Sequence, residues 1–76
     1  MKRLQLSKSL SELEASNSAL VARTKRMMRG SLLTAALKHG PARARDIAIT
    51  EYNETLSAGD GVPMIMHVIT MRIDVP

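Results

Sequence analysis

The sequence predicts an α+β fold, with two to three helices over about residues 7–29, 32–39 and 42–57, followed by one strand over 62–75. Leucine and other stripe-forming residues recur every three or four positions in the first segment, whereas apolar residues alternate through the last. Gly40-Pro41 and a glycine-containing turn at 57–61 separate the segments. A chain of 76 residues forms one small domain over 1–76 at most.

The composition makes a solitary monomer hard to stabilise. A core built from 76 residues is marginal, and with no cysteine there is neither a disulfide nor a thiolate-zinc site to reinforce it. Apolar residues make up 45% of the chain, which is too many for a wholly disordered protein. We therefore expect the chain to be stabilised by association with another chain.

A helix over 7–29 is predicted from a heptad-like stripe. Its members are separated alternately by four and three residues: Leu6, Leu10, Leu13, Asn17, Leu20, Thr24 and Met27. The spacing resembles that of a short leucine zipper, with Asn17 where such zippers accommodate a polar residue. Ser9 and Glu12 have the spacing of a capping box at its start. The alternatives are an amphipathic helix packed within its own domain, or a helix broken at residues 16–18.

The middle of the chain is predicted to form a basic helical hairpin over 31–57. Gly30 interrupts the first helix, Ser31 caps a helix over 32–39, and Gly40-Pro41 ends it. A near-3.6 periodicity favours a helix over 42–57, although Ile49, Thr50 and Tyr52 also favour a strand through 47–52. The stretch LLTAALKHGPARARDIA is similar to the first two helices of winged helix-turn-helix domains, but little room follows for a recognition helix.

The last segment, 62–75, alternates as a strand does. Its first half is apolar on both faces and its second half on one, a pattern typical of a strand whose beginning is covered on both sides. The backbone groups of a buried strand need ladder partners. Since only 47–52 competes as a second strand, we expect the partner strand to come from another molecule.

Charge is divided along the chain. Residues 1–14 sum to +1, residues 15–45 to +7 and residues 46–76 to −4. The middle block has no acidic residue, and such a block favours anionic partners. We predict that its cations contact nucleic-acid phosphates: Arg23, Lys25, Arg26, Arg29, Lys38, Arg43 and Arg45. The alternatives are a solvated basic surface or docking on an acidic protein. Because Tyr52 is the sole aromatic residue, duplex contact is favoured over base stacking.

Few residues suit catalysis or metal binding. The two histidines, His39 and His67, could form a metal site with Asp60 or Asp74, but we predict a helix-end and a strand role for them instead. No arrangement of serine, histidine and carboxylate suggests a nucleophile, and Gly59-Asp60-Gly61 lacks the features of a P-loop. The prediction is therefore a protein that is not an enzyme and has no cofactor, no metal and no small-molecule substrate.

The resulting hypothesis is a small basic protein that self-associates and contacts nucleic acid through 23–45. The predicted interface residues come from the heptad stripe and the strand: Leu6, Leu10, Leu13, Asn17, Leu20, Ile65, Ile69 and Ile73. The alternative is a structural or adaptor subunit of a virion or ribonucleoprotein, or a small inhibitor that docks by strand addition. No membrane-spanning stretch is expected, and the predicted location is the cytoplasm or a virion.

Overall fold

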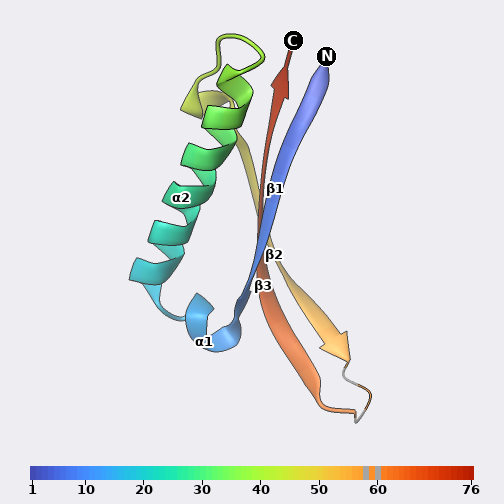
Figure 1. The fold of residues 1–76 in the computed structure, drawn as a ribbon. Coiled ribbons are helices and arrows are strands. Elements are labelled where there is room, and N and C mark those ends of the chain that lie inside the picture. The colour runs from blue at the N-terminus through green and yellow to red at the C-terminus, as the bar shows by residue number, and fades with distance from the viewer. Residues whose placement is uncertain (58, 60) are drawn as a thin grey trace.

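A three-stranded antiparallel sheet with one long helix on one face forms the fold (Figure 1). The computed structural model describes residues 1–57, 59 and 61–76. In chain order the elements are β1 (Lys2–Ser11), α1 (Glu12–Ala15), α2 (Ser18–Leu37), the 3-10 turn η1 (Ala44–Asp46), β2 (Ala48–Ser57) and β3 (Pro63–Val75). The predicted order of helices followed by one strand is therefore wrong.

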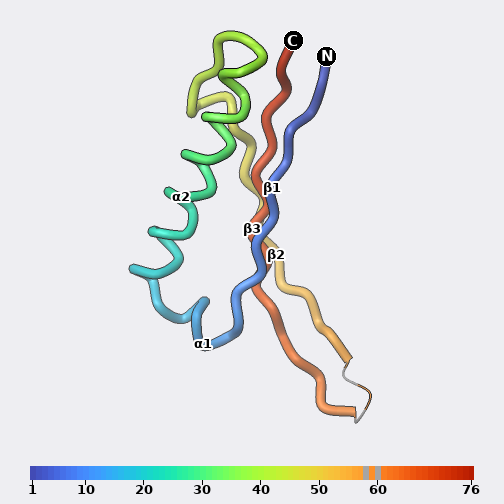
Figure 2. Tube along the Cα trace, in the orientation of Figure 1, coloured from blue at the N-terminus to red at the C-terminus, as the bar shows by residue number. Residues whose placement is uncertain are grey.

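β3 is the central strand, and it takes both neighbours from its own chain. β1 pairs with it from Lys2↔Val75 to Ser11↔Met66, and β2 pairs with it from Ala48↔Arg72 to Ser57↔Pro63. The Cα trace shows β1 and β3 running side by side to the two chain ends (Figure 2). The expectation that the C-terminal strand borrows its partner from another chain is thus also wrong, because two segments predicted as helical are strands.

β1 lies where the predicted helix over 7–29 would begin. Leu4, Leu6 and Leu10 lie on one face of the strand, which Lys8 shares, and polar residues alternate with them on the other face. Leu10 is 1% exposed beneath the helix. The heptad spacing was misleading because it runs through three different elements, β1, α1 and α2. Burial against β3 favours the alternation over the helical stripe.

Two side-chain caps set the path from β1 into the helices. The Ser11 hydroxyl accepts a hydrogen bond from the Glu14 N–H (3.1 Å), and the Glu14 carboxylate accepts one from the Ser11 N–H (3.0 Å). The capping box thus begins two residues later than the predicted Ser9–Glu12 pair. The Asn17 side-chain oxygen accepts from the Leu20 N–H (3.1 Å) and starts α2. The break considered at 16–18 is confirmed.

α2 continues through Gly30, so the predicted interruption there and the separate helix over 32–39 are wrong. The Thr34 hydroxyl donates to the Gly30 carbonyl oxygen at 2.9 Å within the helix. α2 ends at Leu37, and Gly40 follows with a φ of 137°, which favours glycine. The predicted helix over 42–57 is also wrong, since η1 and β2 lie there. The competing strand through 47–52 is confirmed over 48–52, which belongs to β2, whereas Ile47 ends η1.

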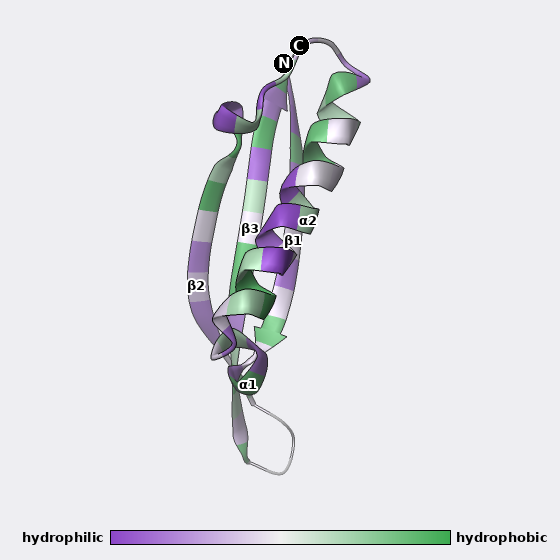
Figure 3. Cartoon of the chain, turned by 90° about the vertical axis from the view of Figure 1, so that its left-hand side faces the viewer, coloured by the Kyte–Doolittle hydropathy of each residue, from purple (hydrophilic) through white to green (hydrophobic). Residues whose placement is uncertain are grey.

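The core lies between α2 and the part of the sheet made by β1 and β3. Its buried members are Leu10, Met28, Leu32, Ala36, Ile69, Met71, Ile73 and Val75. Every residue of β2 is exposed, and Figure 3 shows α2 beside β1, with β2 on the other side of β3. The start of β3 is uncovered as well, with Met64 53% and Ile65 44% exposed, so the prediction that both its faces are covered is wrong.

Candidate nucleic-acid interface

α2 turns two arginines away from the sheet. Thr24, Met28 and Leu32 are buried at four-residue intervals, which fixes the side of the helix that faces β1 and β3. Arg23 and Arg26 lie on the remaining surface and are exposed. The helix contains four cations and no acidic residue, so it presents a positive surface to solvent.

Arg23 and Arg26 share a shallow depression near the beginning of α2. Its volume is about 330 Å³, and it is lined by Asn17, Ala19, Leu20, Arg23 and Arg26. The positive end of the helix dipole lies at this same end of α2. Two guanidinium groups, each able to donate several hydrogen bonds, therefore border a site of positive potential that suits phosphate oxygens.

Lys25 differs from its neighbours because its ammonium group is paired with a carboxylate on β2. Its Nζ donates to the Glu51 carboxylate at 2.9 Å, and this ion pair links α2 to β2. Of the predicted phosphate-binding residues, it alone forms an ion pair within the described part of the chain. We therefore treat Lys25 as the block member least available to a nucleic acid.

The Lys25 ion pair continues into a polar cluster on β2 and β3. Glu51 Oε1 lies 3.2 Å from His67 Nε2, and His67 Nδ1 lies 3.0 Å from Asn53 Oδ1. The hydrogen bond from Lys25, and secondly that from His67, lower the pKa of the Glu51 carboxyl below its usual range, with partial burial opposing them. The cluster fastens an otherwise uncovered strand to the helix.

The remaining block cations lie further along the same layer. Arg29 is half-buried on α2, Lys38 is the residue that caps the end of α2, and Arg43 and Arg45 belong to the connection to β2. The Arg43 N–H donates to the Asp46 carboxylate at 3.2 Å, which holds η1 in place. Fifteen helical steps from Arg23 to Lys38 correspond to about 22 Å. The predicted cations thus form an extended strip, not one cluster.

The predicted interface residues separate into buried and exposed groups. Leu10, Ile69 and Ile73 are at most 2% exposed and belong to the chain's own core. Asn17 caps α2, and Leu13 is 83% exposed on α1. Among the others, Leu20 is half-buried, Leu6 is 37% exposed beside α2, and Ile65 lies near the uncovered start of β3.

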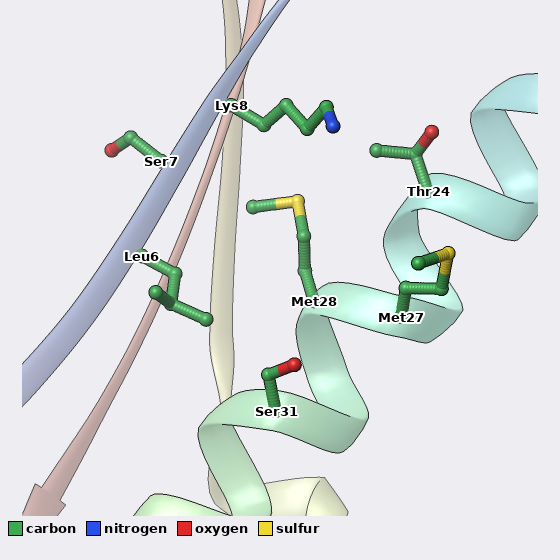
Figure 4. Close-up of a pocket in the computed structure, with 7 residues that line it drawn as sticks. All are labelled: Leu6, Ser7, Lys8, Thr24, Met27, Met28 and Ser31. Atoms are coloured by element: carbon green, nitrogen blue, oxygen red, sulfur yellow. The ribbon is translucent and has the colours of Figure 1, made fainter.

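One surface was missed by the sequence analysis, because its residues come from elements far apart in the chain. A hollow of about 270 Å³ lies between β1 and α2 (Figure 4). It is lined by Leu6, Ser7, Lys8, Thr24, Met27, Met28 and Ser31. Leu6 and Met27 are both exposed there, at 37% and 66%. The only sequence signal was the presence of Leu6 and Met27 in the predicted heptad stripe.

Within the part of the chain that the structure describes, no three side chains of the His, Cys, Asp and Glu types lie close enough to hold a metal ion. His67 is occupied by the Glu51 and Asn53 contacts, and Asp60 lies outside the described residues. No helix in this part of the chain combines the length and apolar character needed to cross a membrane. Comparisons with protein-family models, curated proteins and solved structures found no match.

Proposed function

We propose that this is a small, non-enzymatic protein that self-associates and contacts nucleic-acid phosphates through the outer surface of α2 and the connection that follows it. The supporting observation is the exposed pair Arg23 and Arg26 on a helix that carries no acidic residue. Lys38, Arg43 and Arg45 extend the positive strip along the same layer. As part of the proposal, the protein acts in the cytoplasm or within a virion.

Duplex backbone is the favoured target. Tyr52, the sole aromatic residue, pairs with Val68 on the sheet face opposite α2, so it does not join the arginines in a stacking platform. Cations spread over about 22 Å, from Arg23 to Lys38, suit several phosphates along a backbone. Such contacts give affinity with little sequence preference.

A salt titration of duplex DNA binding tests the proposal. Removing one phosphate-binding cation lowers the slope of log K against log salt by about 0.9, so Arg23→Gln with Arg26→Gln should lower it by about 1.8. The matched control is Arg3→Gln with Arg72→Gln, which removes the same charge from the sheet face opposite α2. No binding by the natural chain at low salt, or equal losses of affinity in both double variants, would overturn the proposal.

A second candidate function is a structural or adaptor subunit, or a small inhibitor, that docks on another protein by strand addition. It is favoured by β2, an edge strand of ten residues that are all exposed and include no proline or glycine. The salt titration separates the two functions. A folded chain that binds no nucleic acid at low salt favours the adaptor, and this candidate fails if duplex DNA binds and the Arg23/Arg26 variant alone loses it.

A further inference from the structure

The accessible surface of the molecule is larger than that of a compact monomer of the same mass. Its accessible surface is 5383 Å². A compact monomer of the same mass exposes about 4,600 Å². Its radius of gyration is 14.7 Å, whereas a compact chain of this length has a value near 11 Å. The excess of about 800 Å² is close to what each partner buries in a protein interface of standard size. Part of it lies on the β2–β3 hairpin and part beside β1.

Two exposed apolar side chains, Leu6 and Met27, line the hollow beside β1. We define the β1–α2 surface as Leu6 on β1 together with Met27 on α2 and the hollow between the two elements. Figure 4 shows Leu6 and Met28 entering this hollow from opposite sides. β1 is an edge strand, so alternate residues turn unpaired N–H and C=O groups outward along the same side.

We propose that a second copy of this chain covers the β1–α2 surface, with the two β1 strands pairing antiparallel about a two-fold axis at Leu6. The product is a six-stranded sheet with both α2 helices on one face. This inference deepens the proposed self-association by assigning its surface and geometry.

The register about Leu6 is self-complementary. It places Lys2 opposite Leu10 of the second copy, Arg3 opposite its Ser9 and Leu4 opposite its Lys8, so no two cations face each other. If the two-fold axis passed through Gln5 instead of Leu6, Lys2 would lie directly opposite the second copy's Lys8, and like-charge repulsion disfavours that pairing. Charge therefore selects against that alternative register.

The sheet spacing brings the two helices to packing distance. Strands in a sheet lie about 4.8 Å apart. α2 packs over β1 and β3, so its axis lies about 5 Å from the two-fold axis and about 10 Å from its mate. Helices pack at 8–10 Å. Met27, which lines the hollow beside β1, then meets its symmetry mate above Leu6.

β2 does not offer the same fit. Pairing through β2 would leave the two α2 helices about 19 Å apart by the same spacing argument, too far for their side chains to interdigitate. The residues of β2 that face the helix side include Glu51 and Asn53, which are engaged by Lys25 and His67. Pairing through β1 is therefore the arrangement that also brings the two α2 helices into contact.

Lys8 modulates this association. Its side chain lines the hollow and extends toward Thr24 (Figure 4). An inward-pointing charge on an edge strand weakens pairing, although a lysine can keep its stem in the interface while the ammonium reaches water. Lys8→Met should therefore tighten the dimer several-fold. The adjacent α2 helices also join their Arg23 and Arg26 side chains into one positive surface across the axis, where a bound polyanion would relieve the repulsion between them.

Single-cysteine variants test the geometry directly, because the natural chain has no cysteine. Residues opposite each other in an antiparallel pair have Cα atoms about 4.5–5.5 Å apart, within disulfide range. Under mild oxidation without nucleic acid, Leu6→Cys should form a covalent dimer, whereas Tyr52→Cys, at the middle of the other edge, should not. Linkage through Tyr52→Cys alone, equal linkage through both, or linkage through neither overturns the proposal.

Sedimentation equilibrium on cysteine-free variants supplies the second measurement. Met27→Glu should weaken dimerisation at least tenfold, while Leu37→Glu, on the same helix and 55% exposed, should change it less than twofold. A natural chain that stays monomeric at several hundred micromolar, or a Met27→Glu variant that dimerises normally, overturns the surface. Dimerisation with no duplex binding would instead overturn only the nucleic-acid proposal, so the two failures are distinguishable.

Discussion

β1 and β2 are both ten-residue edge strands of the same central strand, yet they are held in different ways. β1 lies beneath α2 and contributes the fully buried Leu10. β2 has no buried residue, and beyond its ladder it is fastened by the Glu51 contacts to Lys25 and His67. It follows that β1, β3 and α2 provide the hydrophobic stabilisation, whereas β2 is the element expected to open first.

His67 on β3 pairs with Leu10 on β1 and with Asn53 on β2. Truncating these two partners compares the edge strands directly, and the loss of unfolding free energy at Leu10 should be the greatest of all the variants considered. Leu10→Ala should lower the free energy of unfolding by about 3 kcal/mol, because it leaves a cavity in the core. Asn53→Ala removes one exposed hydrogen bond and should cost no more than about 1 kcal/mol. Urea unfolding measures both values, and equal losses would contradict the comparison.

The same contrast explains what could be predicted of the strands. The predicted bounds of β3 are nearly correct, since one face is apolar along most of the strand, through Ile65, Ile69 and Ile73, and no helical pattern competes with it. β1 was assigned to a helix because Leu6, Leu10 and Leu13 also satisfy a three-four spacing. Only the presence of β3, more than fifty residues away, decides between the two patterns.

β2 was ambiguous for a different reason. Because every residue of β2 is exposed, burial does not determine which of its positions are apolar. Ala48, Tyr52 and Leu56 could therefore satisfy a helical period by chance. Ile49, Thr50 and Tyr52 carried the strand signal through intrinsic preference alone. Without the competing strand, β3 lacked a visible neighbour, and this led to the incorrect expectation that its partner belongs to another chain.

The candidate site was partly predictable, since charge can be counted from the sequence while its surroundings cannot. The run without acidic residues identified Arg23 and Arg26, which the fold places on an exposed surface. It could not reveal that Lys25 is engaged by Glu51, because that contact joins elements 26 positions apart. The β1–α2 hollow was beyond reach for the same reason.

Stiffening the helix that covers β1 should produce a moderate gain. Gly30 lies inside α2 on its exposed side, and a Cβ built there meets nothing within 4 Å. Gly30→Ala should raise the free energy of unfolding by about 0.5–1 kcal/mol, because alanine loses less backbone entropy in a helix. The contrasting variant is Gly40→Ala, which should destabilise the fold because Gly40 has a φ of 137°. Thermal unfolding measures both, and a loss for Gly30→Ala would indicate that α2 is interrupted there.

Removing the polar contacts that join β2 to α2 should change the free energy of unfolding least, and the size of that change should depend on pH. The Lys25 hydrogen bond, followed by that from His67, lowers the pKa of Glu51 in the folded chain. The ionised carboxylate therefore stabilises the fold above about pH 4.3, the unperturbed glutamate value, and this contribution is lost as the pH falls through the lower folded pKa. Glu51→Gln should cost about 0.5 kcal/mol at pH 7, since the pair is partly exposed.

Unfolding by urea at a series of pH values separates this contribution from that of Glu14, whose pKa is also lowered, chiefly by its hydrogen bond from the Ser11 backbone. The difference between the natural chain and Glu51→Gln should be constant from pH 7 to about pH 5 and should shrink toward zero below it. Lys25→Met should show the same pH-dependent loss, because it removes the principal cause of the shift. A difference that grows as the pH falls would show that the carboxylate does not fasten β2 to the helix.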